Sequence, residues 1–213
     1  MTDASDHQKF IDALRLAREQ ESCMESQIFQ GIDVSFADAA LLEFRRITFR
    51  SCRFSECDFT KSDFYLCRFE GCRLSECIFS GAVWNQTEVI RVKGDGCRFD
   101  QNHFRSSALS ESSFRYAVFS GSVWKDCRLT DCCLADAVLS EMELKKTSLR
   151  RLDLRQAELF RTALSGLNLS DSQIDGITVS DTGAELRGAA IRADQAVVAA
   201  HILGIKIVGP QEL

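Results

Sequence analysis

One large apolar residue recurs at every fifth position along most of this 213-residue chain. From Phe29 to Val179 the phase holds Phe, Leu, Val, Ala, Trp or Ile, with Gly94 as the interruption. Twelve of the fifteen Phe residues fall in it, where chance would put about three. A helix repeats its apolar residues every 3.6 positions and a strand every second one, so neither element alone explains the pattern.

A second phase lies two residues before the first and is mostly small. It includes Cys52, Cys57, Ser62, Cys67, Cys72, Cys77, Ala82, Ala117 and Cys127. The other three positions of each unit carry most of the charge, as Arg53 and Glu56 do. Each unit therefore has one large and one small inward residue and three outward ones. The pattern predicts a solenoid in which the chain turns after every unit and each coil buries its neighbour's face.

The units themselves are similar to those of a known family. CRFSE (residues 52–56), CDFTK (57–61), CRFEG (67–71) and AVLSE (137–141) resemble the A(D/N)LXX pattern of pentapeptide-repeat proteins. The resemblance covers residues 27–180 and implies an all-β solenoid, a right-handed quadrilateral β-helix with four units per coil. We then expect the large residues to fill its axis, including Phe54, Phe59, Phe64, Phe69, Trp84, Phe104, Phe119, Trp124, Leu129 and Leu144.

The repeat weakens at residues 85–96 (NQTEVIRVKGDG), although its phase is kept afterwards. Gly94 and Gly96 are typical of turns. Two interpretations remain open. Either an imperfect coil continues, or a loop whose length is a multiple of five protrudes and contacts a partner.

The two ends depart from the repeat. Residues 1–26 predict an N-terminal capping helix from Ser5 to Glu21, with Ser5 and Gln8 as a capping box and Phe10 and Leu14 on its apolar face. Capping of the first coil is the simpler role, because an unpaired coil needs cover; docking of a partner is the alternative.

The C-terminal segment, residues 181–213, predicts a helix capped by Asp194 and ended by Gly204, then a short strand. Its stretch GAAIRADQAVVAAHILGIKIVG resembles the C-terminal end of the Qnr and MfpA proteins, which implies a homodimer interface. Plain capping is the alternative. The implied interface residues are Val197, Val198, His201, Ile202, Leu203, Ile205 and Ile207.

No motif for catalysis or metal binding stands out. Eight of the ten Cys lie in the small inward phase, without the paired spacing of a zinc site; Cys133 is expected to face outward. There is no phosphate-binding loop and no H-E-x-x-H sequence. We therefore expect no enzyme activity, no cofactor and no small-molecule substrate.

Net charge is −5, which disfavours direct binding to nucleic acid. No apolar run approaches the roughly 18 residues that cross a bilayer, so no membrane partner is expected. The polar, acidic N-terminus is unlike a secretory signal, and we expect a cytoplasmic protein whose cysteines stay reduced.

The Qnr and MfpA resemblance implies a DNA mimic that binds DNA gyrase or topoisomerase IV and protects it from quinolones or other poisons. Such a mimic needs an acidic surface. Candidate partner-binding residues are the column Glu111, Asp131 and Asp171, which Arg151 interrupts, and Glu88, Arg91 and Lys93 in the irregular stretch.

The alternative function is an interaction scaffold or effector unrelated to gyrase. Residues 97–180 carry eleven acids and eleven bases, and a 20-residue stacking aligns Arg105, Lys125 and Lys145 in one basic column. A single continuous acidic face would favour the mimic.

Overall fold

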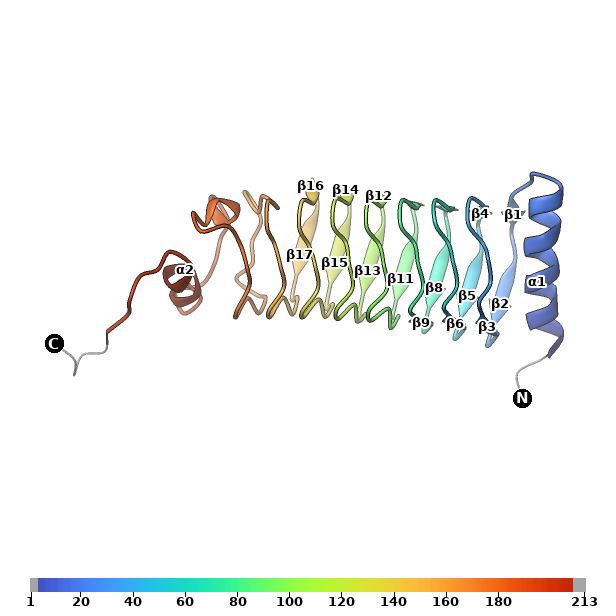
Figure 1. Cartoon of the computed structure of the whole chain (residues 1–213), viewed down its shortest axis with the longest axis horizontal. Coiled ribbons are helices and arrows are strands. Elements are labelled where there is room, and N and C mark those ends of the chain that lie inside the picture. The colour runs from blue at the N-terminus through green and yellow to red at the C-terminus, as the bar shows by residue number, and fades with distance from the viewer. Residues whose placement is uncertain (1–3, 209–213) are drawn as a thin grey trace.

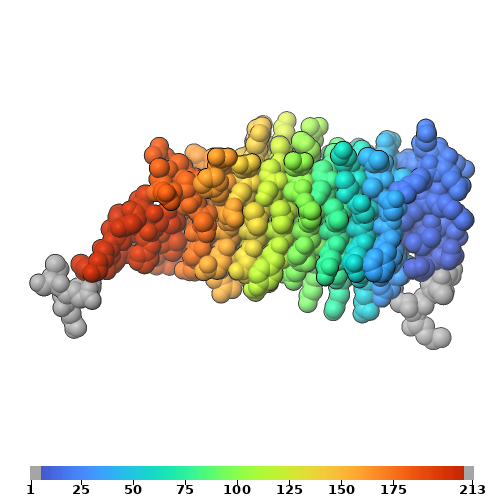
Figure 2. Space-filling model, in the orientation of Figure 1, coloured from blue at the N-terminus to red at the C-terminus, as the bar shows by residue number. Residues whose placement is uncertain are grey.

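The repeat region winds into a right-handed, four-sided parallel β-solenoid, seen in a computed structural model that describes residues 4–208, with side chains from residue 6. Coils stack into a rod, helix α1 lies across its N-terminal end, and α2 lies beyond the last coils (Figure 1). In the space-filling view the coils form one continuous rod (Figure 2).

Four faces, A to D, make up the rod. Face A is a seven-stranded sheet of β1 (Met24–Glu25), β4 (Glu43–Arg45), β7 (Asp63–Tyr65), β10 (Val83–Asn85), β12 (His103–Arg105), β14 (Val123–Lys125) and β16 (Glu143–Lys145). Face B contains β2 (Ile28–Gln30), β5 (Thr48–Arg50), β8 (Arg68–Glu70), β11 (Glu88–Ile90), β13 (Ala108–Ser110), β15 (Arg128–Thr130) and β17 (Ser148–Arg150).

Face C starts with β3 (Asp33–Ser35), β6 (Arg53–Ser55) and β9 (Arg73–Ser75) and continues through single bridges to Gln173. Face D consists only of single bridges, which join every twentieth residue from Asp38 to Thr178. All pairings are parallel, and each residue pairs with the one 20 positions later, as Trp84 does with Phe104, except in the last bridge, where Asn168 pairs with Ala190. This constant register produces four straight faces.

The corners between faces are in the left-handed region of backbone conformation. Every fifth residue from Ser26 to Gly166 has a positive φ, including 23 residues that are not glycine. Left-handed conformation is costly for residues with a Cβ, so the stacked backbone hydrogen bonds of the coils must hold these corners in place.

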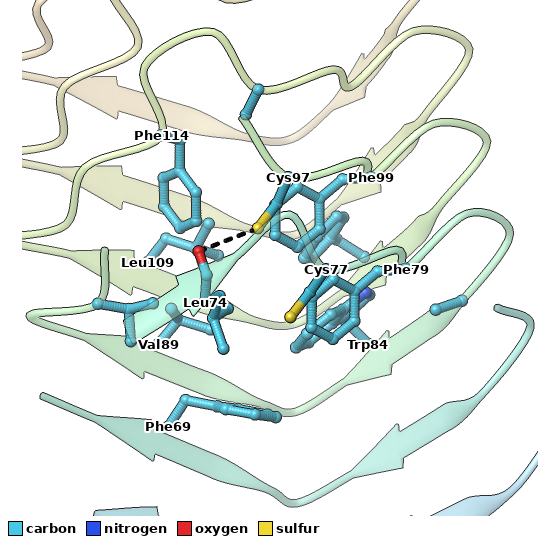
Figure 3. Packing of buried hydrophobic residues seen from close by; sticks show 14 of the residues in the cluster. Phe69, Leu74, Cys77, Phe79, Trp84, Val89, Cys97, Phe99, Leu109 and Phe114 are labelled. Carbon is cyan, nitrogen blue, oxygen red and sulfur yellow. Dashed lines mark hydrogen bonds between the residues drawn. The ribbon is translucent and has the colours of Figure 1, made fainter. Parts of the chain in front are cut away.

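Aromatic ladders fill the axis (Figure 3). The rings of Phe59, Phe79, Phe99 and Phe119 stack almost parallel, with centroids 4.8 to 5.0 Å apart. Trp84, Phe104 and Trp124 lie in a second column. Of the ten axial residues named above, all are buried except Leu144, which is partly buried. Leu144 lines an apolar cavity of about 30 Å³ in the leucine-rich half of the rod.

The small inward residues that are Cys, Ser or Thr are hydrogen-bond donors. Cys97 Sγ donates to the carbonyl of Leu74 at 3.3 Å (Figure 3), and Ser122 Oγ donates to that of Phe99 at 2.8 Å. In both cases the acceptor lies 23 residues earlier, on the previous coil. A thiol or hydroxyl here therefore gives a buried carbonyl an additional hydrogen bond.

Residues 85–96 continue the coil and form no protruding loop. Strands β10 and β11 pair in register with the coils on both sides. Gly94 occupies a buried axial position, and a Cβ there would lie 2.9 Å from the ring of Phe114. The axis stays filled at this coil because the ring of Phe114, one coil later, occupies the space that Gly94 leaves.

Helix α1 (Ala4–Glu19) covers the first coil. Phe10, Leu14 and Ala17 are buried, and the ring of Phe10 lies edge-on to Phe29 with centroids 5.0 Å apart. The predicted helix is confirmed, but it ends two residues earlier than expected. The capping box at Ser5 lies outside the described side chains, and Gln8 Nε2 donates to Asp12 at 3.1 Å.

At the other end the chain adds a 3₁₀ turn, η1 (Ala184–Leu186), and helix α2 (Ala196–Ile202). The predicted Asp194 cap is wrong: Gln195 is the N-cap residue and makes no capping bond with its side chain. Arg192 binds the carboxylate of Asp194 through two nitrogens, each 2.9 Å away. Gly204 follows the helix with φ 70°.

The strand predicted after α2 is absent from the described part of the segment, which ends at residue 208. The amide of Ile205 donates to Ala200 and so belongs to the end of the helix. A strand needs a neighbour to pair with, and residues 205–208 pair with none of the described residues.

Candidate interaction surface

Charge is distributed unequally over the four faces. Counting outward residues and the corner that follows, face A has five carboxylates and six Lys or Arg, and face B has the same numbers. Face C, counted without its following corner, has four carboxylates and five cations. By these counts faces A and B are nearly neutral, and face C is neutral only without the C–D corner, whose acids Glu56, Glu76 and Asp136 are counted with face D below.

Face D is acidic. In the first coil this surface consists of corner residue 36 and outward residues 38 and 40. The residues 20, 40, 60 and more positions later, up to 180, occupy the same places in the following coils. These positions contain one cation, Arg98, and seven carboxylates: Asp38, Glu56, Asp58, Glu76, Asp100, Asp136 and Glu158. The corner between faces D and A adds Lys61, Glu141 and Arg161.

Three of the seven carboxylates pair with an arginine. Arg18 on α1 binds Asp38, Arg98 binds Asp100, and Arg115 binds Asp136. Glu56, Asp58, Glu76 and Glu158 have no ion-pair partner among the described residues. Dissolved salt weakens the field of an unpaired carboxylate but does not cancel its charge. The negative potential of face D is therefore strongest at these four carboxylates.

The acidic column predicted from sequence lies elsewhere. Glu111, Asp131 and Asp171 occupy the corner between faces B and C. Arg151 binds Asp131 with both Nε and a terminal nitrogen, at 2.7 and 2.8 Å, and lowers the pKa of that carboxyl. Arg150 binds Asp171 at 2.7 Å, and Arg91 lies 4.0 Å from Glu111. This corner is balanced, and Arg151 is a partner of the acids.

Glu88, Arg91 and Lys93 are exposed on faces B and C. Glu88 pairs with Arg68, and Arg91 pairs with Glu70 at 2.5 Å. With residues 85–96 wound into the coil, these side chains lie on the flat sides of the rod and do not form a projecting site.

The basic column occupies face A, where Arg105, Lys125 and Lys145 pair in register. Lys145 also binds Glu143 at 2.5 Å, whereas Arg105 and Lys125 have no ion-pair partner among residues 4–208. Face A adjoins face D, so the acidic and basic surfaces lie on neighbouring sides.

The C-terminal segment leaves apolar side chains uncovered. Val198 and Ile202 pack against the end of the core, while Val197, His201, Leu203, Ile205 and Ile207 are exposed. The residues implied for a dimer interface therefore divide into two sets, of which only the second faces outward.

The surroundings of the cysteines are those of buried core residues. All eight in the small inward phase are buried, and burial raises the pKa of Cys67 and of Cys132 to about 11. Cys133 is half-buried, with Sγ 3.6 Å from Asp153, and burial raises its pKa as well. Within residues 4–208 no His, Cys, Asp and Glu side chains gather into a metal-binding group.

In the described part of the chain, no helix has the length and apolar character needed to cross a membrane.

A rod of this kind, with straight faces and a filled axis, is a β-solenoid repeat protein. Two family models of pentapeptide repeats match, the nine-copy model over residues 43–87 and the eight-copy model over residues 125–159. These two stretches are therefore built of the repeats that define the pentapeptide-repeat family. No curated protein matches the sequence.

Several solved structures are similar. Full-length QnrB1, a plasmid-mediated fluoroquinolone resistance protein, is 15% identical, with 84% of this chain and 100% of that chain covered and a TM-score of 0.35. HetL from Nostoc sp. strain PCC 7120, involved in heterocyst differentiation regulation, is 16% identical, with 83% and 95% covered and a TM-score of 0.31. Rfr23 from Cyanothece 51142 is 11% identical, with 86% and 99% covered and a TM-score of 0.26. At these values the likenesses carry no information about a partner.

Proposed function

We propose that this chain is a non-catalytic DNA mimic that binds DNA gyrase or topoisomerase IV and protects it from quinolones or other poisons. The observation that carries the proposal is face D, where seven carboxylates and one cation follow the length of a straight rod. A basic surface that normally receives DNA would attract such a face, and the neutral faces B and C can point away from it.

The partner-binding residues are accordingly reassigned to Glu56, Asp58, Glu76 and Glu158, which no arginine pairs with in the described residues. A carboxylate already bound to a guanidinium has less to offer an incoming cation. For that reason Asp131 and Asp171 are weaker candidates than they are from sequence.

We also propose that the rod is a homodimer joined through its C-terminal segment. The outward set Val197, Leu203, Ile205 and Ile207 supports this, since these side chains are roughly half exposed in the single chain. Apolar patches of this kind commonly mark interfaces.

A gyrase supercoiling assay, with and without a fluoroquinolone, tests the gyrase proposal. Wild-type protein should rescue supercoiling in the presence of the drug. The variant Asp58→Lys with Glu76→Lys should need at least about tenfold more protein, because opposed charges across an interface weaken association strongly.

The matched control is Glu43→Lys with Asp63→Lys, which makes the same two reversals on face A. It should behave as wild type if face D is the binding surface. Equal losses in the two variants would mean that net charge alone matters, and a wild-type protein without effect on gyrase or topoisomerase IV would reject the mimic.

An interaction scaffold unrelated to gyrase is the second candidate. The unpaired Arg105 and Lys125 on face A favour it, because a basic column has no role in mimicry of a polyanion. Binding of the wild-type protein to an acidic protein, lost in Arg105→Ala with Lys125→Ala, would support this function.

A further inference from the structure

We propose that the N-terminal end of face D is a docking site for a cationic amphipathic segment of a protein partner, with Phe36 and Leu41 as its apolar anchors. The inference rests on the proposed role of face D as the partner-binding surface. It adds that the partner must present apolar side chains beside its cations, which simple mimicry of a DNA backbone does not require.

Phe36 and Leu41 are the most exposed large apolar residues in the described chain, at 73% and 72%. They occupy the two corners that border face D in the first coil, with φ 57° and 64°. At such corners glycine is the unstrained choice, and it is present at Gly71 and Gly81. Bulky apolar side chains here neither fill the core nor relieve backbone strain, so folding gives no reason for them.

Each anchor lines a groove between α1 and the first coil. Phe36 lies in a groove of about 450 Å³ with Ile11 and Leu14, and Leu41 lies in one of about 630 Å³ with Ala17 and Leu42. The ion pair of Arg18 and Asp38 lines both grooves, which therefore adjoin across it. The Arg18–Asp38 pair thus separates two partly apolar grooves, and a partner could insert one apolar side chain into each of them.

Charge next to the anchors defines the partner. In the first three coils the counted positions of face D hold Asp38, Glu56, Asp58 and Glu76, and the D–A corner that carries Leu41 adds one cation, Lys61. A segment that places its apolar side chains on Phe36 and Leu41 would lie with its polar side over these carboxylates. Lys or Arg is the complementary choice there.

Two other exposed aromatic side chains on this side of the rod have a guanidinium over their rings. Arg115 lies over the ring of Tyr116 at 5.4 Å, and Arg161 lies over Phe160 at 5.0 Å. No guanidinium covers Phe36 in this way among the described residues. Phe36 and Leu41 are therefore the most exposed apolar side chains on this side of the rod.

The test compares two fluorescent peptides of equal length and charge, one an amphipathic helix of leucine and lysine, the other of glycine and lysine. Wild-type protein should prefer the leucine peptide by about tenfold or more, because burial of one large apolar side chain is enough for such a ratio. Part of that binding should persist in high salt, where the glycine peptide is released.

Phe36→Ser with Leu41→Ser should remove the preference and leave affinity for the glycine peptide unchanged. Ile28→Ser with Leu66→Ser, exposed apolar residues on other sides of the rod, should retain it. Glu56→Gln with Glu76→Gln should weaken both peptides. Thermal melts of all variants would establish that each is folded.

A preference that survives Phe36→Ser with Leu41→Ser, or that Ile28→Ser with Leu66→Ser removes equally, overturns the docking site. The outcome is separate from that of the gyrase assay. If gyrase is unaffected by wild-type protein but the peptide preference follows Phe36 and Leu41, the gyrase proposal fails and the docking site stands.

Discussion

Each pentapeptide buries two side chains, and they do different work. The large one packs in the axis, as Phe79 does between Phe59 and Phe99. The small one, where it is Cys, Ser or Thr, often donates a hydrogen bond to a carbonyl of the previous coil, as Cys72 does to Phe49 at 3.3 Å. The sequence predicted that both side chains point inward, because a five-residue period determines which positions face the axis.

Ion pairing could not be predicted in the same way. Arg151 looks in the sequence like a break in an acidic column, yet it binds Asp131 one coil away. Arg150 reaches Asp171, which is 21 positions later and at a corner. Such pairs depend on side-chain direction across coils, which the spacing of residues does not determine.

Gly94 provides a test of axial packing. Gly94→Ala should lower the free energy of unfolding by about 1–3 kcal/mol, because the new methyl group would overlap the ring of Phe114. In a protein that already carries Phe114→Leu, the change Gly94→Ala should cost less free energy of unfolding than it does in wild type. Urea denaturation of the four proteins measures the coupling.

The control is Gly96→Ala, since a Cβ there meets nothing within 4 Å and only the left-handed backbone, φ 72°, opposes it. Its cost should be smaller, about 1 kcal/mol. Equal costs at positions 94 and 96 would show that contact with Phe114 is not the cause.

The ends of the rod need cover, and different elements provide it. Helix α1 was predictable from its apolar face, because Phe10, Leu14 and Ala17 repeat at helical spacing. The C-terminal end was only partly predictable. Its cover depends on single polar side chains, such as Gln195, which donates to the carbonyls of Leu169 and Ser172.

Glu185 closes the last coil in a similar way. One carboxylate oxygen accepts from the amide of Arg161 at 2.9 Å, and the other from the amide and hydroxyl of Ser180. Burial raises the pKa of Glu185, but the hydrogen bonds from Ser180 and Arg161 outweigh it, and the pKa is lowered. A lowered pKa stabilises the fold above the unfolded-state value, about 4.3 for Glu.

Glu185→Gln should therefore lower the free energy of unfolding by about 1–3 kcal/mol at pH 7, because an amide NH₂ would face a backbone N–H. The difference from wild type should shrink as pH falls below about 4, where the native carboxylate protonates. Thermal melts from pH 3 to 7 measure this, with the exposed Glu56→Gln as control. A difference independent of pH would contradict the charged role of Glu185.

At the scale of the whole molecule, asymmetry between faces is the main finding. The totals are balanced in residues 97–180, and only the 20-residue register separates face D from the rest. The acidic surface could have been found in the sequence, but only by combining two columns of residues spaced 20 apart. One column contains Glu56 and the other contains Asp58, two positions later.

The proposed dimer can be tested at the same scale. Leu203→Glu with Ile205→Glu should convert a dimer to a monomer in analytical ultracentrifugation, because charges cannot be buried unpaired at an apolar interface. Val198→Glu is a less useful change, since Val198 packs against the core and its loss would disturb the fold. A wild-type protein that sediments as a monomer at high concentration would reject the dimer.

The constant register has a consequence for how such a rod can change in length. Removal of a whole coil, 20 residues, shortens the rod and leaves every later side chain on its original side. Removal of a single five-residue unit would keep every large residue in the axis but rotate all that follows by a quarter turn. Asp136 and Glu158 would then point to a different side from Glu56 and Glu76, in a molecule whose axis still receives one large residue from every unit but with different neighbours in each column. The five-residue repeat would survive either deletion, whereas a surface formed by one face would survive only the first.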